Sequence, residues 1–116
     1  MEDDIVLITS PITRQQLKEM ASKRFGDMVK AVVDVEKQIM ALGGDLHADE
    51  EAYLIQNGSQ QMNLWGINLY PDLDFPGILE FDSMINIRPS QSNRSRSVDN
   101  PATQGIIESI VKRMIQ

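Results

Sequence analysis

The chain has 116 residues, of which 41% are apolar, so residues 1–116 can build one hydrophobic core and are expected to form a single domain. Seventeen acidic against eleven basic residues give a net charge of -6, which repels polyanions and disfavours nucleic acid as a partner. There is no cysteine, which excludes disulfides and thiolate sites, and no stretch approaches the roughly 20 apolar residues of a membrane-spanning helix, so no membrane role is expected.

The first predicted element is a short strand. Ile5 to Ile8 is rich in β-branched residues, and Ser10-Pro11 ends the run. The residues before it, Met1 to Asp4, are acidic, whereas a signal peptide begins with basic residues and carries a longer apolar stretch. We therefore expect a strand or an extended arm here, and a cytoplasmic location.

A helix over residues 13–25 follows. Thr13 and Gln16 have the spacing of a capping box, in which each side chain bonds to the backbone of the other residue. Gly26 supplies a stop signal directly after the last apolar residue of the helical face.

Residues 29–42 favour a β-hairpin. Apolar and polar side chains alternate from Val29 to Glu36, and a second apolar segment, Ile39 to Leu42, follows the turn Glu36-Lys37-Gln38. A single helix from Met28 to Leu42 is the rival interpretation, because the turn lacks glycine and the segment contains good helix formers.

The middle of the chain predicts a second helix and a strand. Glu50 to Ile55 follow Asp45 to Asp49, whose side chains could cap the helix. Leu64 to Tyr70 is predicted as a strand that places Trp65 in the core, in preference to a role in stacking on a nucleic-acid base. A loop over residues 71–77 closes a hairpin with the next strand.

Ile78 to Arg88 has the clearest strand pattern, with apolar residues at alternate positions. Pro89 to Asp99 has no periodicity and is rich in serine, which predicts a long loop that is either functional or disordered. Asn100 as N-cap and Pro101 at the first helical position begin a terminal amphipathic helix.

Together these elements predict an α+β fold, in which a mostly antiparallel sheet of four or five strands is packed on one face by two or three amphipathic helices. Asp34 and Glu36 on one strand, and Glu80 and Asp82 on another, would then point away from the core. They form either a solvated surface or, if the two strands are neighbours, paired carboxylates for a metal or for acid–base work.

The loop from Arg88 to Arg96 is the best candidate binding site. Between Gln38 and Ile87 there are eight acidic residues and no Lys or Arg, whereas the loop carries three arginines and no acid. Guanidinium groups match carboxylate and phosphate oxygens, although the arginines could instead pair with the chain's own carboxylates. The candidate binding residues are Asn86, Arg88, Ser90, Asn93, Arg94 and Arg96.

The only histidine, His47, lies beside a cluster of carboxylates that includes Asp49. These two residues are the candidates for catalysis. The cluster could bind a divalent cation, and His47 could cleave a phosphodiester together with the loop arginines. The structural alternative for His47 is a capping or turn residue, and the pattern assigns no metal site and no cofactor.

Several segments together resemble a small bacterial and archaeal domain family of unknown function, and the similarity runs from Asp27 through the terminal helix. It implies a stand-alone microbial domain and transfers no functional role. The family's loop carries glycines near positions 92 and 97, where this chain has Ser92 and Ser97, which puts the loop geometry in question if φ is positive there. The segments that carry the resemblance are residues 27–36, Leu46-His47-Ala48-Asp49, Asn63-Leu-Trp65-Gly66-Ile-Asn68 and Ser83-Met-Ile-Asn-Ile-Arg88-Pro89.

The leading hypothesis is a non-enzymatic binding module that recognises an anionic small molecule or an acidic partner segment through the Arg88–Arg96 loop. The first rival is a small metal-assisted or histidine-assisted phosphodiester hydrolase. The second is a protein-interaction or dimerisation domain, which an exposed apolar patch including Val32 and Met84 would favour.

Overall fold

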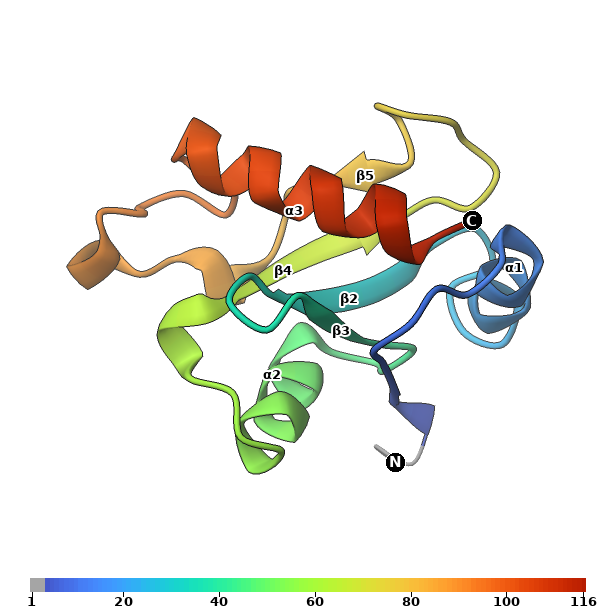
Figure 1. Ribbon diagram of the computed structural model, residues 1–116, viewed down its shortest axis with the longest axis horizontal. Coiled ribbons are helices and arrows are strands. Elements are labelled where there is room, and N and C mark those ends of the chain that lie inside the picture. The colour runs from blue at the N-terminus through green and yellow to red at the C-terminus, as the bar shows by residue number, and fades with distance from the viewer. Residues whose placement is uncertain (1–3) are drawn as a thin grey trace.

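The computed structural model describes residues 4–116, so the acidic residues Met1–Asp3 of the expected cytoplasmic start lie outside the described residues. Its centre is a five-stranded, fully antiparallel open sheet with the strand order β1-β3-β2-β4-β5 (Figure 1). The strands are β1 (Val6–Ile8), β2 (Val29–Asp34), β3 (Ile39–Leu42), β4 (Leu64–Leu69) and β5 (Leu79–Glu80), and the helices are α1 (Arg14–Ser22), α2 (His47–Gln56) and α3 (Pro101–Met114). The predicted α+β class and antiparallel sheet are confirmed.

The helices α1 and α3 pack on one face of the sheet, in agreement with the two or three helices predicted there, and α2 covers the other face, which the sequence did not predict. Figure 1 shows α3 along one side of the sheet and α2 on the other. The larger core lies under α1 and α3 and contains Leu17, Ile67 and Ile110. A smaller core under α2 joins Leu54 to Val32 on β2. The reason is that the strands also carry apolar residues such as Val32 on their second face, and these need cover.

The hairpin over residues 29–42 is confirmed, and the rival helix is absent. Asp34 explains how the turn forms without glycine: its Oδ1 accepts hydrogen bonds from the backbone N–H groups of Glu36 and Lys37, both at 2.9 Å. Gln38 adopts the left-handed conformation that the turn requires, with φ of +58°. Asp34 is buried in this turn, so it does not belong to the solvated surface that the sequence favoured. The alternative, a carboxylate pair with Glu80, required neighbouring strands and is ruled out because β4 separates β2 from β5.

The helix ends follow local signals with one exception. Thr13 forms the predicted capping box with Gln16, and Asn100 caps α3 through Ala102 N. The N–H of Gly26 bonds to the carbonyl of Ala21 at 2.7 Å, although α1 itself already ends at Ser22. The exception is α2, which begins at His47 without any side-chain cap, so the predicted capping by residues 45–49 is wrong.

Residues 78–88 are not the continuous strand that their alternating pattern predicts. Only Leu79–Glu80 pairs with β4, and Met84–Asn86 forms a 3-10 helix, η3. The side chain of Asn86 makes the hydrogen bonds that the backbone of a longer strand would make. It accepts one from Gly66 N at 2.8 Å and donates one to Gly66 O at 2.9 Å. One side-chain amide thus satisfies the backbone edge of β4 that β5 leaves unpaired.

The segment after η3 is ordered by local turns. Pro89–Gln91 forms a 3-10 helix, η4, and Arg88 pairs with Asn93 as an isolated antiparallel bridge. Ser92 lies between them with φ of +61°, which is the left-handed conformation that glycine favours. A serine here therefore adopts the backbone geometry expected of the glycine in the similar family.

Candidate functional site

Arg88 is used by the fold itself. Its guanidinium group lies over the ring of Trp65, 4.2 Å from the centroid, and donates hydrogen bonds to the carbonyl oxygens of Gln61, at 2.5 Å, and Leu64. The stacking and the two backbone acceptors fix the position of this guanidinium group, and its Nε is buried without a hydrogen-bond partner among the described residues. Trp65 is buried, as predicted, and it holds Arg88 against the sheet rather than presenting it to a ligand.

Asn86 and Asn93 form the internal scaffold of the same region. Both side chains are buried. Asn93 donates to the carbonyl oxygens of Asn86, at 2.7 Å, and Ser97, at 2.8 Å, and accepts from the N–H of Asp99. Asn86 donates to the carbonyl of Arg96 at 3.0 Å in addition to its two bonds with β4. The polar atoms of both residues are therefore already paired within the chain.

The three loop arginines do not converge. Arg88 points to Trp65, and Arg94 and Ser90 are exposed, with no side-chain hydrogen bond or ion pair to residues 4–116. Arg96 differs from them, because its side chain turns toward the sheet face that α2 covers and lines a pocket there. Of the six predicted binding residues, the structure brings only Arg96 to this pocket.

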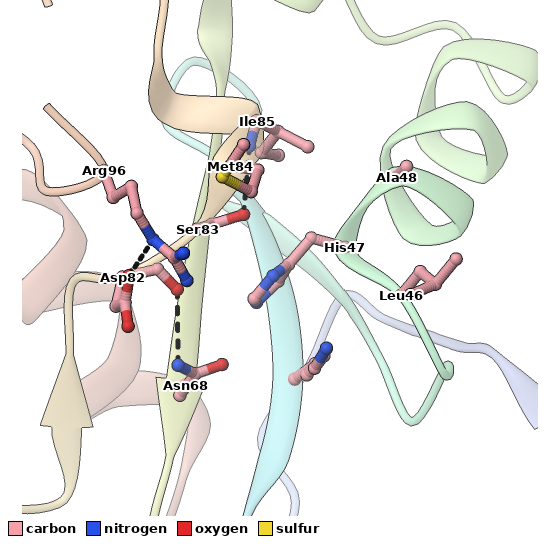
Figure 2. A pocket seen from close by; sticks show the side chains of 10 residues that line it. Leu46, His47, Ala48, Asn68, Asp82, Ser83, Met84, Ile85 and Arg96 are labelled. Carbon is pink, nitrogen blue, oxygen red and sulfur yellow. Dashed lines mark hydrogen bonds and ion pairs between the residues drawn. The ribbon is translucent and has the colours of Figure 1, made fainter. Parts of the chain in front are cut away.

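The pocket has a volume of about 240 Å³ and lies between the start of α2 and residues 82–85 (Figure 2). Figure 2 shows Arg96 and Asp82 on one side of it and the ring of His47 on the other. Its floor is the sheet, where Lys30 of β2 and Asn68 of β4 are directly opposed cross-strand partners. The lining residues are Lys30, Leu46, His47, Ala48, Asn68, Asp82, Ser83, Met84, Ile85 and Arg96.

Two cations and one carboxylate set the charge of this pocket. Arg96 Nε donates to Asp82 Oδ1 at 2.6 Å, and the two terminal nitrogens of Arg96 make no hydrogen bond within the described part of the chain. Lys30 is half-buried, with its Nζ 5.2 Å from the Phe25 ring centroid, and makes no ion pair with residues 4–116. With His47 uncharged, the lining carries a net charge of +1.

His47 is held as a neutral imidazole. Its Nε2 lies 2.8 Å from the carbonyl oxygen of Ile67, so this nitrogen carries the proton and Nδ1 is left as an acceptor. Burial lowers the pKa of His47 below its ordinary value of 6.5. The carbonyl of Ile67 and the nearby Asn68 oppose this shift, and the positive charge of Lys30 adds to it.

Asn68 and Ser83 complete the polar floor. Asn68 Nδ2 donates to Glu80 Oε1 at 2.9 Å and to the carbonyl of Asp82 at 3.3 Å, which fixes the orientation of the amide. Its Oδ1 is buried without a hydrogen-bond partner among the described residues. Ser83 Oγ accepts from Ile85 N at 3.2 Å and keeps its own proton free to donate.

The start of α2 forms one wall of the pocket. Leu46 occupies the N-cap position and offers no side-chain acceptor, so the first N–H groups of the helix have no side-chain cap. Such groups carry partial positive charge at a helix N-terminus. The side chains of Leu46 and Ala48 lie beside them and make this wall apolar.

The predicted catalytic pair is not assembled. Asp49 is exposed and lines a separate pocket with Tyr53 and Gln56, whereas His47 faces the pocket described above. Within residues 4–116 no three His, Asp or Glu side chains come together as ligands for a metal ion. The structure does place His47 and Arg96 on one pocket, while Arg88 and Arg94 lie elsewhere.

Sequence reasoning missed Lys30, Asn68 and Ser83 as site residues. The signal was present in part, because Lys30 and Asn68 interrupt two strands that are otherwise almost entirely apolar and share the face opposite the main core. Only the strand register shows that they are neighbours.

The exposed apolar patch that would favour a protein-interaction domain does not form with the expected residues. Met84 is exposed, but Val32 is buried under α2.

One family model matches the chain. It is described as a protein of unknown function, DUF5674, and the match covers residues 6–114. Neither the comparison with curated proteins nor the comparison with solved structures finds a match. No helix within the described residues has the length and apolar character to cross a membrane.

Proposed function

Because the chain belongs to this family of unknown function, DUF5674, we propose a function from the site: the domain is a non-enzymatic binding module for a small anionic molecule. The ligand occupies the pocket between α2 and residues 82–85. Arg96 and Lys30 supply the attracting charges, and Ser83 and the first turn of α2 supply neutral donors.

The observation that supports this proposal is a local reversal of charge. The whole chain carries a net charge of -6, yet the lining of this pocket has a net charge of +1. Its two cations are Arg96, whose terminal nitrogens make no hydrogen bond within the described residues, and Lys30, which makes no ion pair with them. An acidic protein repels anions over most of its surface, so a positive concavity directs an anion to one place.

Of the three arginines in the Arg88–Arg96 loop, only Arg96 belongs to the proposed binding site. Arg88 stacks on Trp65, and Arg94 lies on the exposed side of the loop, so neither contributes to the pocket. Arg96 keeps two terminal nitrogens for a ligand while Asp82 fixes its orientation through Nε. A planar group positioned in this way is prepared for bidentate contact with two oxygen atoms.

Arg96→Ala and Arg94→Ala form a matched pair for the test, because each removes one exposed arginine from the same loop. Sodium acetate is titrated into each ¹⁵N-labelled protein at constant ionic strength with chloride as the counter-salt. The amide signals of Ala48, Asn68 and Ser83 should shift with saturation in the native chain and in Arg94→Ala, but not in Arg96→Ala. Equal responses in the two variants, or no saturable shift in the native chain, would reject the pocket as an anion site.

Phosphodiester hydrolysis is the second candidate, and the position of His47 and Arg96 on one pocket favours it. The free Nδ1 of a neutral imidazole can accept a proton from water. Incubation with bis(4-nitrophenyl) phosphate, with and without Mg²⁺, separates the two functions. Release of nitrophenolate that is lost in His47→Gln would establish an enzyme, whereas a binding module gives the buffer rate.

A further inference from the structure

We infer that the ligand of this pocket is a monoanion with a short apolar chain, of the class of small monocarboxylates. The inference rests on the proposed function, since it names the chemistry of the molecule that the same pocket holds. Three properties of the lining carry it: the net charge, the distribution of apolar side chains and the volume.

The charge of the lining fits one negative charge and not two. Lys30 and Arg96 are offset by Asp82, which already takes one hydrogen bond from Arg96. Glu80, the cross-strand neighbour of Asn68, does not line the pocket, and its carboxylate accepts hydrogen bonds from Asn68 and Tyr70. A monoanion neutralises the surplus of one positive charge, whereas a dianion such as phosphate would leave an excess negative charge beside Asp82.

The rim of the pocket is apolar on two opposite sides. Leu46 at the start of α2 is 54% exposed, and Met84 in η3 is 64% exposed, and both line the pocket. Figure 2 shows Met84 above Ser83, with Leu46 on the far side of His47. Exposed side chains of this size at a polar pocket indicate contact with apolar ligand atoms, and methionine adapts its shape to such groups.

The floor and the rim therefore recognise different parts of one molecule. The carboxylate lies at Arg96 and Lys30, and the chain runs outward between Leu46 and Met84. A volume of about 240 Å³ is below the roughly 300 to 1,000 Å³ of sites for drug-sized ligands, which favours a small molecule over a nucleotide or a large cofactor. A carboxylate with a chain of a few carbons is of suitable size.

The test compares acetate, hexanoate and inorganic phosphate by the same amide titration at constant ionic strength. Each methylene that is buried should tighten binding by about fourfold, so hexanoate should bind at least about tenfold more tightly than acetate. Phosphate should bind more weakly than hexanoate. Phosphate as the tightest of the three, or hexanoate no tighter than acetate, would overturn the inference.

Met84→Ser and Met62→Ser provide the matched control, because both methionines are highly exposed and only Met84 lines this pocket. Met84→Ser should weaken hexanoate by about three- to fivefold and leave acetate unchanged, while Met62→Ser should change neither. Binding of acetate that depends on Arg96, without any preference for hexanoate, would reject the inference and leave the proposed function standing. Failure of all three anions to bind would reject both.

Discussion

Replacing Asn86 with alanine should destabilise the domain strongly, although the sequence made this residue a candidate for ligand binding. The side chain makes three hydrogen bonds, two with the backbone of Gly66 and one with the carbonyl of Arg96, and it is fully buried. At about 1 kcal/mol of net stability for each bond, the loss is about 3 kcal/mol. The backbone groups left without partners make this the lower end of the expectation.

Urea unfolding followed by the fluorescence of Trp65, the single tryptophan, measures this loss. Small proteins lose about 1 to 3 kcal/mol of stability per molar urea, so the midpoint of Asn86→Ala should fall by roughly 1 to 3 M. Ser90→Ala serves as the control because Ser90 is exposed in the same region and makes no side-chain hydrogen bond with residues 4–116. Its midpoint should stay within experimental error of the native value.

A loss below about 1 kcal/mol in Asn86→Ala would refute the reasoning. It would mean that the edge of β4 finds other partners, and that the segment over residues 83–96 is not held by this amide. An equally large loss in Ser90→Ala would show instead that any change in the region disturbs the fold.

The other predictions use the same unfolding assay. Gly66→Ala places a Cβ 2.5 Å from Ser83 Cβ and Oγ and should cost about 1 to 3 kcal/mol, most of which Ser83→Gly should restore. Burial raises the pKa of Glu50 well above its ordinary value of 4.5, so the folded chain keeps a proton that the unfolded chain releases, and this contribution to stability falls as the pH rises above 4.5. The stability of Glu50→Gln relative to the native chain should therefore increase with pH. Arg88→Lys should cost about 1 to 2 kcal/mol, because lysine cannot stack on Trp65 and reach both carbonyls.

Each of these predictions has a result that contradicts it. If Ser83→Gly leaves the cost of Gly66→Ala unchanged, the clash lies elsewhere than between β4 and η3. A Glu50→Gln variant whose stability runs parallel to that of the native chain across the pH range would show that Glu50 is ionised in the folded state. Native stability in Arg88→Lys would return Arg88 to the set of candidate ligand-binding residues.

Local signals predicted those parts of the fold that local contacts determine. The capping box at Thr13, the N-cap at Asn100 and the turn after Asp34 each depend on residues within a few positions, and each forms where expected. The alternating apolar pattern of β4 was equally reliable, because the sheet buries one side of it against the main core.

The prediction of a continuous strand over residues 78–88 was wrong because two different structures can produce the same alternating pattern. Alternation is typical of a strand, and it also arises where a 3-10 turn buries Ser83 and Asn86 against another strand. What decides between them is Gly66, which has no side chain and lets Ser83 approach β4 closely. That contact joins residues far apart in the chain, so no local window contains it.

The candidate site was predictable only in part for the same reason. Arg96 and His47 stood out by charge and by rarity, but their common pocket depends on the strand register that pairs Lys30 with Asn68. The other arginines looked equivalent in sequence. Trp65 separates them, since it takes Arg88 out of contact with any ligand.

The hydrophobic clusters on the two faces of the sheet differ in size, so we expect the two faces to differ in local stability. Among the described residues, the cluster on the side that carries α2 has five buried apolar residues, whereas the cluster on the opposite side is more than three times as large. Regions with few buried contacts exchange their amide protons through small, frequent excursions. We therefore expect the amide protons of α2 to exchange faster than those of α3, and a ligand that contacts both α2 and Arg96 to slow that exchange.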